Sequence, residues 1–128
     1  MTIHHHGWAA TVSNSKRFTT DTGIHGRYEA AYVNIAIDAN SVRRTVRSPQ
    51  RLANVWDSIK QYLSQTFLEV VPLYELEKAG EFNPDQPSAK GTDFIAAELS
   101  RAGTMLAALW YTAWLESAEP PRIPLSSK

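Results

Sequence analysis

The sequence predicts an all-α protein built as a multi-helix bundle, and three observations favour this fold class. Two stretches, 52–71 and 95–114, repeat apolar residues at the three- and four-residue intervals of one helix face. Polar segments rich in turn residues, "DANS" and "EFNPDQPSAKGT", separate the helical patterns. No segment has the strict alternation of a half-buried strand, and no internal repeat is visible. The length suits one domain, predicted over residues 1–119 and followed by a Pro-rich tail at 120–128.

The first predicted helix is short. It starts near Ile24, with Asp21 or Thr22 as its N-cap, and runs through "HGRYEAAYVNIAI" until "DANS" ends it. We interpret Tyr28 and Tyr32 of this helix as core or helix-packing aromatic residues rather than as platforms for stacking bases. The preceding residues have no periodicity and predict an irregular, extended segment.

The second predicted helix begins at Ser48, as N-cap, with Pro49 at the first helical position. Pro72 should kink or interrupt this helix because it lacks an N–H group, and Gly80 should end it as the C-cap. Its apolar face is formed by Leu52, Val55, Trp56, Ile59, Tyr62, Leu63, Phe67, Val70 and Val71.

The last predicted helix starts at Thr92 or Asp93. One apolar seam runs along it, through Ile95, Leu99, Ala102, Leu106, Leu109 and Ala113. Met105, Trp110 and Trp114 widen the seam, so this helix should be buried on most sides, and the pattern also places Trp56 in the core. Two long helices and a short one make a thin bundle for such wide apolar faces, which indicates either a fragment or an oligomer.

Composition narrows the function classes. Acidic and basic residues balance to a formal charge of zero, without the clustered Lys and Arg typical of a nucleic-acid binder. The chain has no cysteine, so disulfides and thiolate metal ligands are excluded. The start "MTIHHHGWAATV" does not read as a signal peptide. The longest apolar stretch, 105–115, is much shorter than the about 20 residues of a bilayer span.

The stretch "GIHGRYE" places His25 and Glu29 four residues apart, on one face of a helix. An imidazole and a carboxylate on one turn can begin a zinc site, with a third ligand drawn from His4, His5 or His6. Two alternatives stay open from these residues alone. The pair occurs as an ordinary polar pair in many helices, and three adjacent histidines also occur as the remnant of an expression tag.

The segments "HHHGW" and "TTDTGIHGRYEAAYVN" resemble a central part of the zinc-dependent phospholipase C and S1/P1 nuclease superfamily. "GIHGRYE" matches every specified position of the family pattern G-[IF]-H-x-[RK]-[YF]-E, and "AELSRAGTMLAALWYTAW" resembles the closing helix. The resemblance implies that the chain is the C-terminal portion of that all-helical fold. It also implies an extracytoplasmic location.

Carried over to this sequence, the resemblance implies Zn²⁺ as the cofactor and three of its ligands: His6, with His5 as the weaker choice, together with His25 and Glu29. In the family these positions hold one zinc of a three-metal cluster, whose other ligands precede them in the chain. The family's proline two places before the first histidine ligand is His4 here, which leaves the choice between His5 and His6 open.

Two functions from different classes follow. The first is a zinc-dependent phosphoesterase that uses a metal-bound water on phosphate esters of nucleic acid or phospholipid head groups, with weak or no activity in this chain alone. The second is a non-enzymatic helical structural or interaction protein whose apolar helix faces are covered by self-association.

Overall fold

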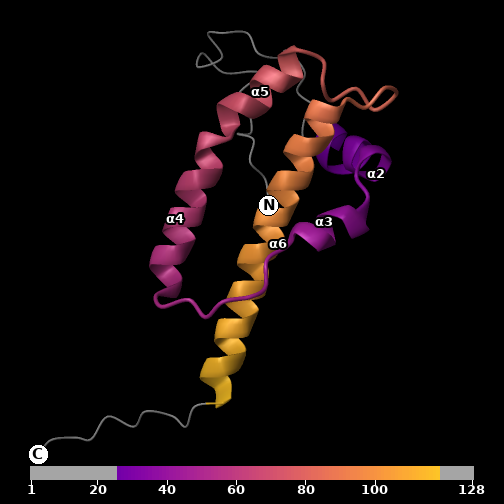
Figure 1. The fold of residues 1–128 in the computed structure, drawn as a ribbon. Helices are drawn as coiled ribbons and strands as arrows, with labels where there is room; N and C mark the ends of the chain where they lie inside the picture. The colour runs from indigo at the N-terminus through magenta and orange to yellow at the C-terminus, as the bar shows by residue number, and fades with distance from the viewer. Residues whose placement is uncertain (1–25, 119–128) are drawn as a thin grey trace, which may run out of the picture.

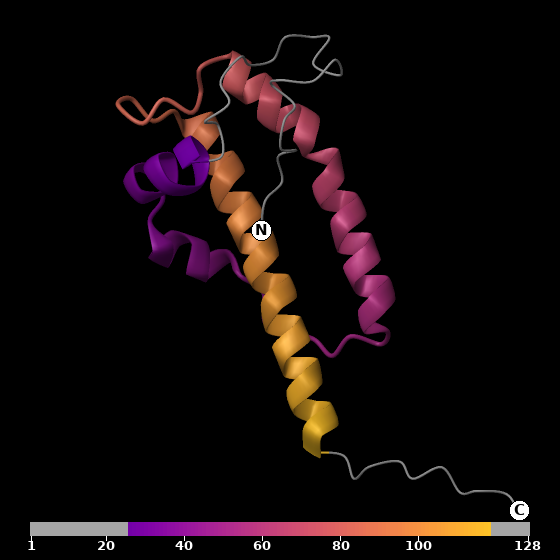
Figure 2. The same cartoon turned by 180° about the vertical axis from the view of Figure 1, so that it is seen from behind.

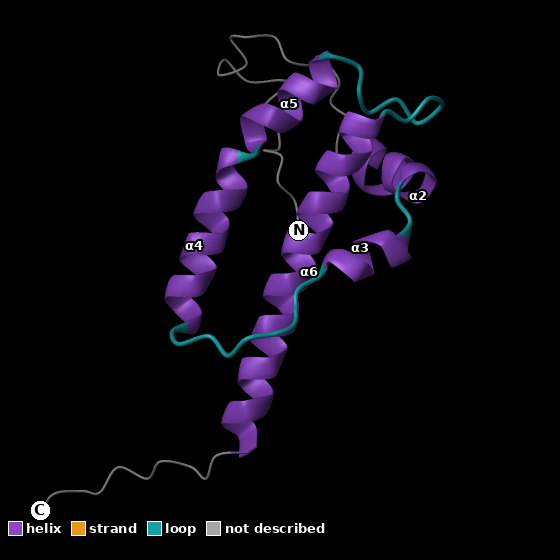
Figure 3. Ribbon diagram, in the orientation of Figure 1, coloured by secondary structure: helices purple, strands orange, loops and turns teal. Residues whose placement is uncertain are grey.

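The computed structural model describes residues 26–118, and every regular element in this range is a helix (Figures 1 and 3). The prediction of an all-α protein is therefore confirmed for this part of the chain. Residues 1–25 and 119–128 lie outside the described residues, so the predicted irregular start, the domain limits and the tail stay predictions. In chain order the elements are the π-helix η2 (Arg27–Tyr32), α2 (Val33–Ala36), α3 (Ala39–Thr45), α4 (Val55–Leu68), α5 (Val70–Lys78) and α6 (Ala89–Ala118).

Helix α6 is the axis around which the other helices are arranged (Figures 1 and 2). Helices α4 and α5 lie on one of its sides, with α5 leaning back toward the N-terminal end of α6. The η2–α2 segment and α3 lie on the opposite side, and α3 packs directly on α6. The C-terminal turns of α6 extend beyond these neighbours (Figure 1).

The hydrophobic core lies where η2, α5 and the start of α6 meet. The Phe82 ring, in the loop before α6, makes edge contacts with Tyr28 and Tyr32 at centroid distances of 4.8 and 5.4 Å. Leu73 and Tyr74 of α5 are fully buried beside them. The predicted packing role of Tyr28 and Tyr32 is confirmed, since both tyrosines belong to this cluster.

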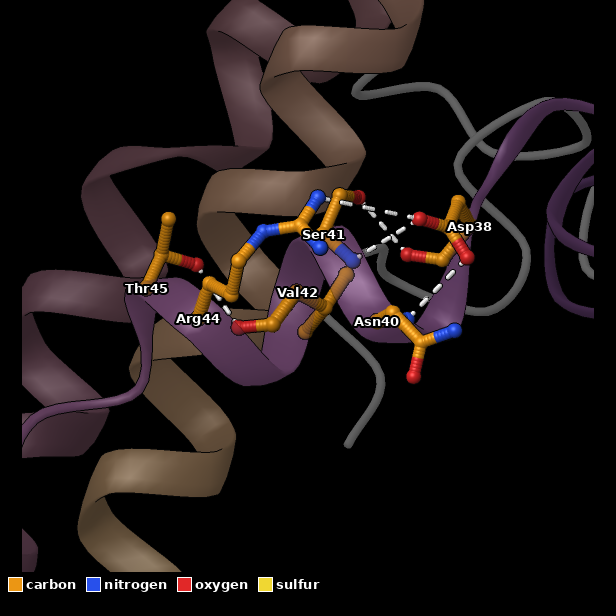
Figure 4. A network of polar contacts seen from close by, with 6 residues as sticks. All are labelled: Asp38, Asn40, Ser41, Val42, Arg44 and Thr45. Carbon is orange, nitrogen blue, oxygen red and sulfur yellow. Dashed lines mark hydrogen bonds and ion pairs between the residues drawn. The ribbon is translucent and has the colours of Figure 1, made fainter.

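The segment "DANS" ends one helix and begins another, and only the first of these was predicted from the sequence. The first helix does end there, because Ile37 is extended. Asp38 then caps a further helix, α3, which was not predicted: its carboxylate accepts from the backbone N–H groups of Asn40 and Ser41 at 3.1 and 3.0 Å (Figure 4). Asp at an N-cap satisfies N–H groups that have no partner within the helix.

The predicted helix start at Ser48 and Pro49 is wrong. Residues 46–54 form an irregular segment, and α4 begins at Val55, with the Asn54 side chain accepting from the Asp57 N–H at 3.0 Å. The tertiary reason is a row of hydroxyl groups on α6. Thr104 accepts from the Arg47 N–H at 3.1 Å and Thr112 from the Leu52 N–H at 2.9 Å. These two bonds hold residues 46–54 along α6, so the segment does not form a helix.

The predicted interruption near Pro72 is confirmed. Helix α4 ends at Leu68 and α5 begins at Val70, which places the proline in the first turn of α5, where its missing N–H costs little. Gly80 ends α5 as predicted, with φ of 77°. The N–H groups of Gly80 and Glu81 return to carbonyls of the last turn of α5, the arrangement that glycine allows at a helix end.

Helix α6 begins at Ala89, earlier than the predicted start at Thr92 or Asp93. The Ser88 hydroxyl caps it by accepting from the Gly91 N–H at 3.0 Å. Gly91 is needed there because a Cβ would clash with the Glu81 carbonyl oxygen and come within 2.7 Å of the Tyr32 hydroxyl oxygen. The close approach of the loop before α6, together with Tyr32 of η2, therefore selects a glycine inside the helix.

The prediction that three tryptophans lie in the core is wrong. Trp56, Trp110 and Trp114 are 66, 70 and 65% exposed. The expectation that α6 is buried on most sides holds for Ile95 but fails in the second half of the helix, where no described element covers the outer face. No helix within residues 26–118 combines the length and apolar character needed to span a membrane.

Candidate metal centre

The structure describes one of the predicted zinc ligands. Glu29 lies in η2, and its side chain is exposed. His5, His6 and His25 lie outside the described residues, so the convergence of the three ligands stays a prediction. Within residues 26–118, no three His, Cys, Asp or Glu side chains gather closely enough to hold a metal ion.

Glu29 is carried by a turn of unusual geometry. Arg27–Tyr32 is a π-helix, which continues directly into the α-helix α2. Isolated π-helical turns are rare in proteins, but those that occur are often found at functional sites. The wider turn changes the direction in which side chains leave the helix. Here the turn directs Tyr28 and Tyr32 into the core and leaves Glu29 exposed.

The start of this turn is fixed by Glu77 of α5. One carboxylate oxygen of Glu77 forms an ion pair with the Arg27 guanidinium, and the other accepts from the Tyr28 hydroxyl at 3.1 Å. The Glu77 side chain is only 8% exposed. One nearly buried carboxylate, about fifty positions further along the chain, therefore binds the two residues that immediately precede Glu29.

The electrostatics of this contact keep Tyr28 a neutral donor. Burial, reinforced by the nearby negative charge of Glu77, raises the pKa of the Tyr28 hydroxyl far above its ordinary value. A tyrosine that stays protonated at every physiological pH donates to the carboxylate continuously. The position of the turn is thus insensitive to the ionisation of Tyr28.

The end of the turn is fixed by the start of α6. The Tyr32 hydroxyl donates to the Ser88 carbonyl at 3.4 Å and lies 3.2 Å from the Thr92 hydroxyl. Because Tyr32 is completely buried, these polar contacts offset the cost of removing its hydroxyl from water. Both ends of η2 are held by residues distant in sequence, with Glu29 between them.

The described donor, Glu29, is of a chemical type that binds zinc. A carboxylate oxygen is a common zinc ligand, and the turn that carries Glu29 is held at both of its ends. The Arg27 guanidinium forms an ion pair with Glu77. It is thereby directed toward α5.

Sequence reasoning missed Glu77, although one signal was present. Glu77 follows Leu73 by four residues and Tyr74 by three, so it lies on the buried face of α5. A carboxylate on a buried face needs a partner, because an unpaired buried charge is costly. The pattern could therefore have predicted a cationic or hydroxyl partner, but not that the partner belongs to the "GIHGRYE" segment.

A groove lies between α4 and α6, away from Glu29. This groove has a volume of about 830 Å³, and much of its lining is neutral and polar, including Ser58, Gln61 and Gln65 of α4 and Ser100 and Thr104 of α6. Two cations also line the groove, Arg47 and Arg101, and Arg101 is paired with Glu69 at 3.2 Å and Glu98 at 2.7 Å. The groove therefore offers mostly neutral hydrogen-bonding groups, together with the exposed Arg47.

Comparisons of this chain with protein-family models, with curated proteins and with solved structures found no match.

Proposed function

We propose that this chain is a portion of a zinc-dependent phosphoesterase and that Glu29 is one of its zinc ligands, together with His25 and His6. The substrates would be phosphate esters of nucleic acid or phospholipid head groups. The proposal also includes the finer fold assignment, the C-terminal part of the phospholipase C and S1/P1 nuclease fold. The match of "GIHGRYE" to the family pattern supports it.

One structural observation carries the proposal. In the segment that matches the pattern, the Arg and Tyr are tied to Glu77 and the Glu is exposed on the turn that they anchor. That division suits a metal-binding turn, because a ligand gains affinity when its backbone is fixed before the ion arrives. An ordinary surface glutamate would not need its two preceding neighbours bound to a buried carboxylate.

The chemistry follows from the type of centre. A bound zinc ion lowers the pKa of its water to near neutrality and withdraws charge from a phosphoryl oxygen. The residues of this chain would hold the ion and orient it, with Glu29 supplying a carboxylate oxygen. A single centre lacks the second and third metals that hold the attacking and leaving oxygens, so we expect weak or no hydrolysis of a chromogenic phosphodiester by this chain alone.

The test is zinc affinity, measured on the purified chain by equilibrium dialysis and elemental analysis. Wild type should bind close to one zinc per chain, and both Glu29→Gln and His25→Ala should weaken binding by on the order of tenfold or more. Glu75→Gln is the matched control, since Glu75 is an exposed glutamate of α5. It should bind zinc as wild type does.

Glu29→Gln is the decisive variant because of the histidines at positions 4–6. Such a run can bind zinc unaided, as an affinity tag does, and that binding would not depend on a carboxylate at position 29. Equal zinc affinity in wild type and Glu29→Gln would contradict the proposal, even if both chains contain zinc.

A further inference from the structure

The second half of α6 has an outer face that is unusual for a solvated helix. From Ala102 to Leu115 no side chain carries a charge. Leu106, Trp110 and Trp114 follow one another at intervals of four and are 47, 70 and 65% exposed. A helix in contact with water normally presents charged or polar residues on that side. We call this row, together with Ala102 and Ala118 at its ends, the α6 ridge.

From Leu106 onward the α6 ridge points away from the rest of the described molecule, whereas Val46 packs beside its N-terminal end, against Gly103. Thr104 and Ala108 of α6 line the groove, and each is two residues from Leu106, so both lie about 160° around the helix from it at about 100° per residue. Ala108 lies at about the same angle from Trp110. The polar side of α6 therefore holds the 46–54 segment and faces α4, while its apolar side faces outward. No element within residues 26–118 buries Trp110 or Trp114.

The exposed apolar area matches one protein interface. A tryptophan has roughly 250 Å² of side-chain surface, so two of them at about two-thirds exposure, with Leu106 and its small neighbours, offer on the order of 400 Å². A standard interface covers about 800 Å² per partner, of which somewhat more than half is apolar. The absence of charge agrees as well, since charged residues are depleted at interface centres.

The spacing of the α6 ridge suits a second copy of this chain. In an antiparallel pair centred on Trp110, Leu106 lies opposite the partner's Trp114 and Ala102 opposite the partner's Ala118. A two-fold interface requires such a self-complementary row. Residues four apart form the ridges of the commonest helix-packing class, and small residues at the ends of the row leave room for indole rings.

We propose that the α6 ridge is a homodimer interface in which two copies of α6 pack antiparallel about Trp110. A lipid surface fits less well, because helices that lie on membranes carry Lys and Arg along their polar face, and α6 has none from Ala102 to Leu115. The proposal is independent of zinc binding. It assigns the self-association expected from the wide apolar faces to one defined surface.

A third exposed tryptophan within residues 26–118 provides a matched control. Trp56 of α4 is 66% exposed, nearly the same as Trp110. Lys60, one helical turn later on the same side, is charged and paired with Asp57 at 2.7 Å, and it separates Trp56 from the exposed Leu63 and Phe67 further along α4. Trp56→Gln removes an equally exposed indole without touching the α6 ridge.

The experiment is sedimentation analysis of the full 128-residue chain over a wide concentration range. Wild type should form a dimer, Trp110→Gln should weaken the dimer by more than tenfold as a central interface residue does, and Trp56→Gln should leave it unchanged. Circular dichroism establishes that both variants remain helical. A monomeric wild type, or equal weakening by the two substitutions, overturns the proposal. A monomer that cosediments with anionic phospholipid vesicles would assign the face to lipid.

A single cysteine tests the antiparallel arrangement, because the chain has none of its own. In a pair centred on Trp110, the two Ser117 positions lie roughly 20 Å apart along the axis at 1.5 Å per residue. Ser117→Cys should therefore not form a disulfide-linked dimer on mild oxidation. Rapid cross-linking would contradict the antiparallel arrangement.

Discussion

The aromatic cluster near the start of α6 is buried, whereas the tryptophans along its second half are exposed. Near the start of α6, Tyr28, Tyr32 and Phe82 are buried in one cluster, and each tyrosine hydroxyl contacts a polar group. Along its second half, Trp110 and Trp114 are largely exposed. Within helices, Tyr28 and Tyr32 lie four residues apart, and so do Trp110 and Trp114. The difference teaches that periodicity identifies an apolar face, whereas the available neighbours decide whether that face is covered.

The largest expected effect is the loss of Phe82. Its ring is completely buried and contacts Tyr28, Tyr32 and Phe94, so Phe82→Ala leaves a cavity where η2, α5 and α6 meet. We expect the free energy of unfolding, measured by urea denaturation, to fall by about 3–5 kcal/mol. Trp110→Ala, measured where the chain is monomeric, should change it by less than about 1 kcal/mol. Similar losses at both positions would erase the contrast between the two ends.

The next effect concerns the anchor of the candidate metal turn. Glu77→Gln removes the charge that pairs with Arg27 and weakens the bond from Tyr28, so unfolding should cost about 1–3 kcal/mol less. Amide hydrogen exchange of residues 27–32 should also accelerate, because the turn loses its tie to α5. The exposed Glu75 provides the control substitution. Unchanged exchange in Glu77→Gln would show that the turn holds its shape without this carboxylate.

The smallest effect concerns Glu98, which lies between the two regions. Burial raises the pKa of the Glu98 carboxyl, with Glu69 adding to the shift and Arg101 opposing it. The folded chain therefore holds this proton more tightly than the unfolded chain, so the contribution of Glu98 to stability falls as the pH rises from the ordinary carboxyl pKa through the raised one. As the pH rises across that interval, the unfolding temperature of Glu98→Gln should increase relative to that of wild type. An increase of this difference on acidification instead would contradict the assigned direction.

The sequence predicted several local features because their causes are local. The break near Pro72 and the end of α5 at Gly80 follow from a missing N–H and from a glycine with positive φ. Helix starts were predicted less well. Ser48 with Pro49 has the sequence of a helix start, yet two backbone bonds to α6 hydroxyls hold that segment extended, and α4 starts at Val55.

The candidate site was predicted in the same uneven way. The "GIHGRYE" pattern singled out Glu29, which the structure leaves exposed, but nothing in the pattern identified Glu77 as the residue that fixes the turn. Contacts between residues about fifty positions apart depend on how α5 meets η2. The spacing of residues within one segment carries no information about that meeting.

By itself, the sequence determined the helical class, the apolar faces and the ends that glycine and proline impose, because these depend on backbone geometry within a few residues. Only the tertiary structure decided which apolar face is buried and which remains outside. The polar side of α6 binds the 46–54 segment through its hydroxyl groups, and this contact turns the opposite, tryptophan-bearing side outward.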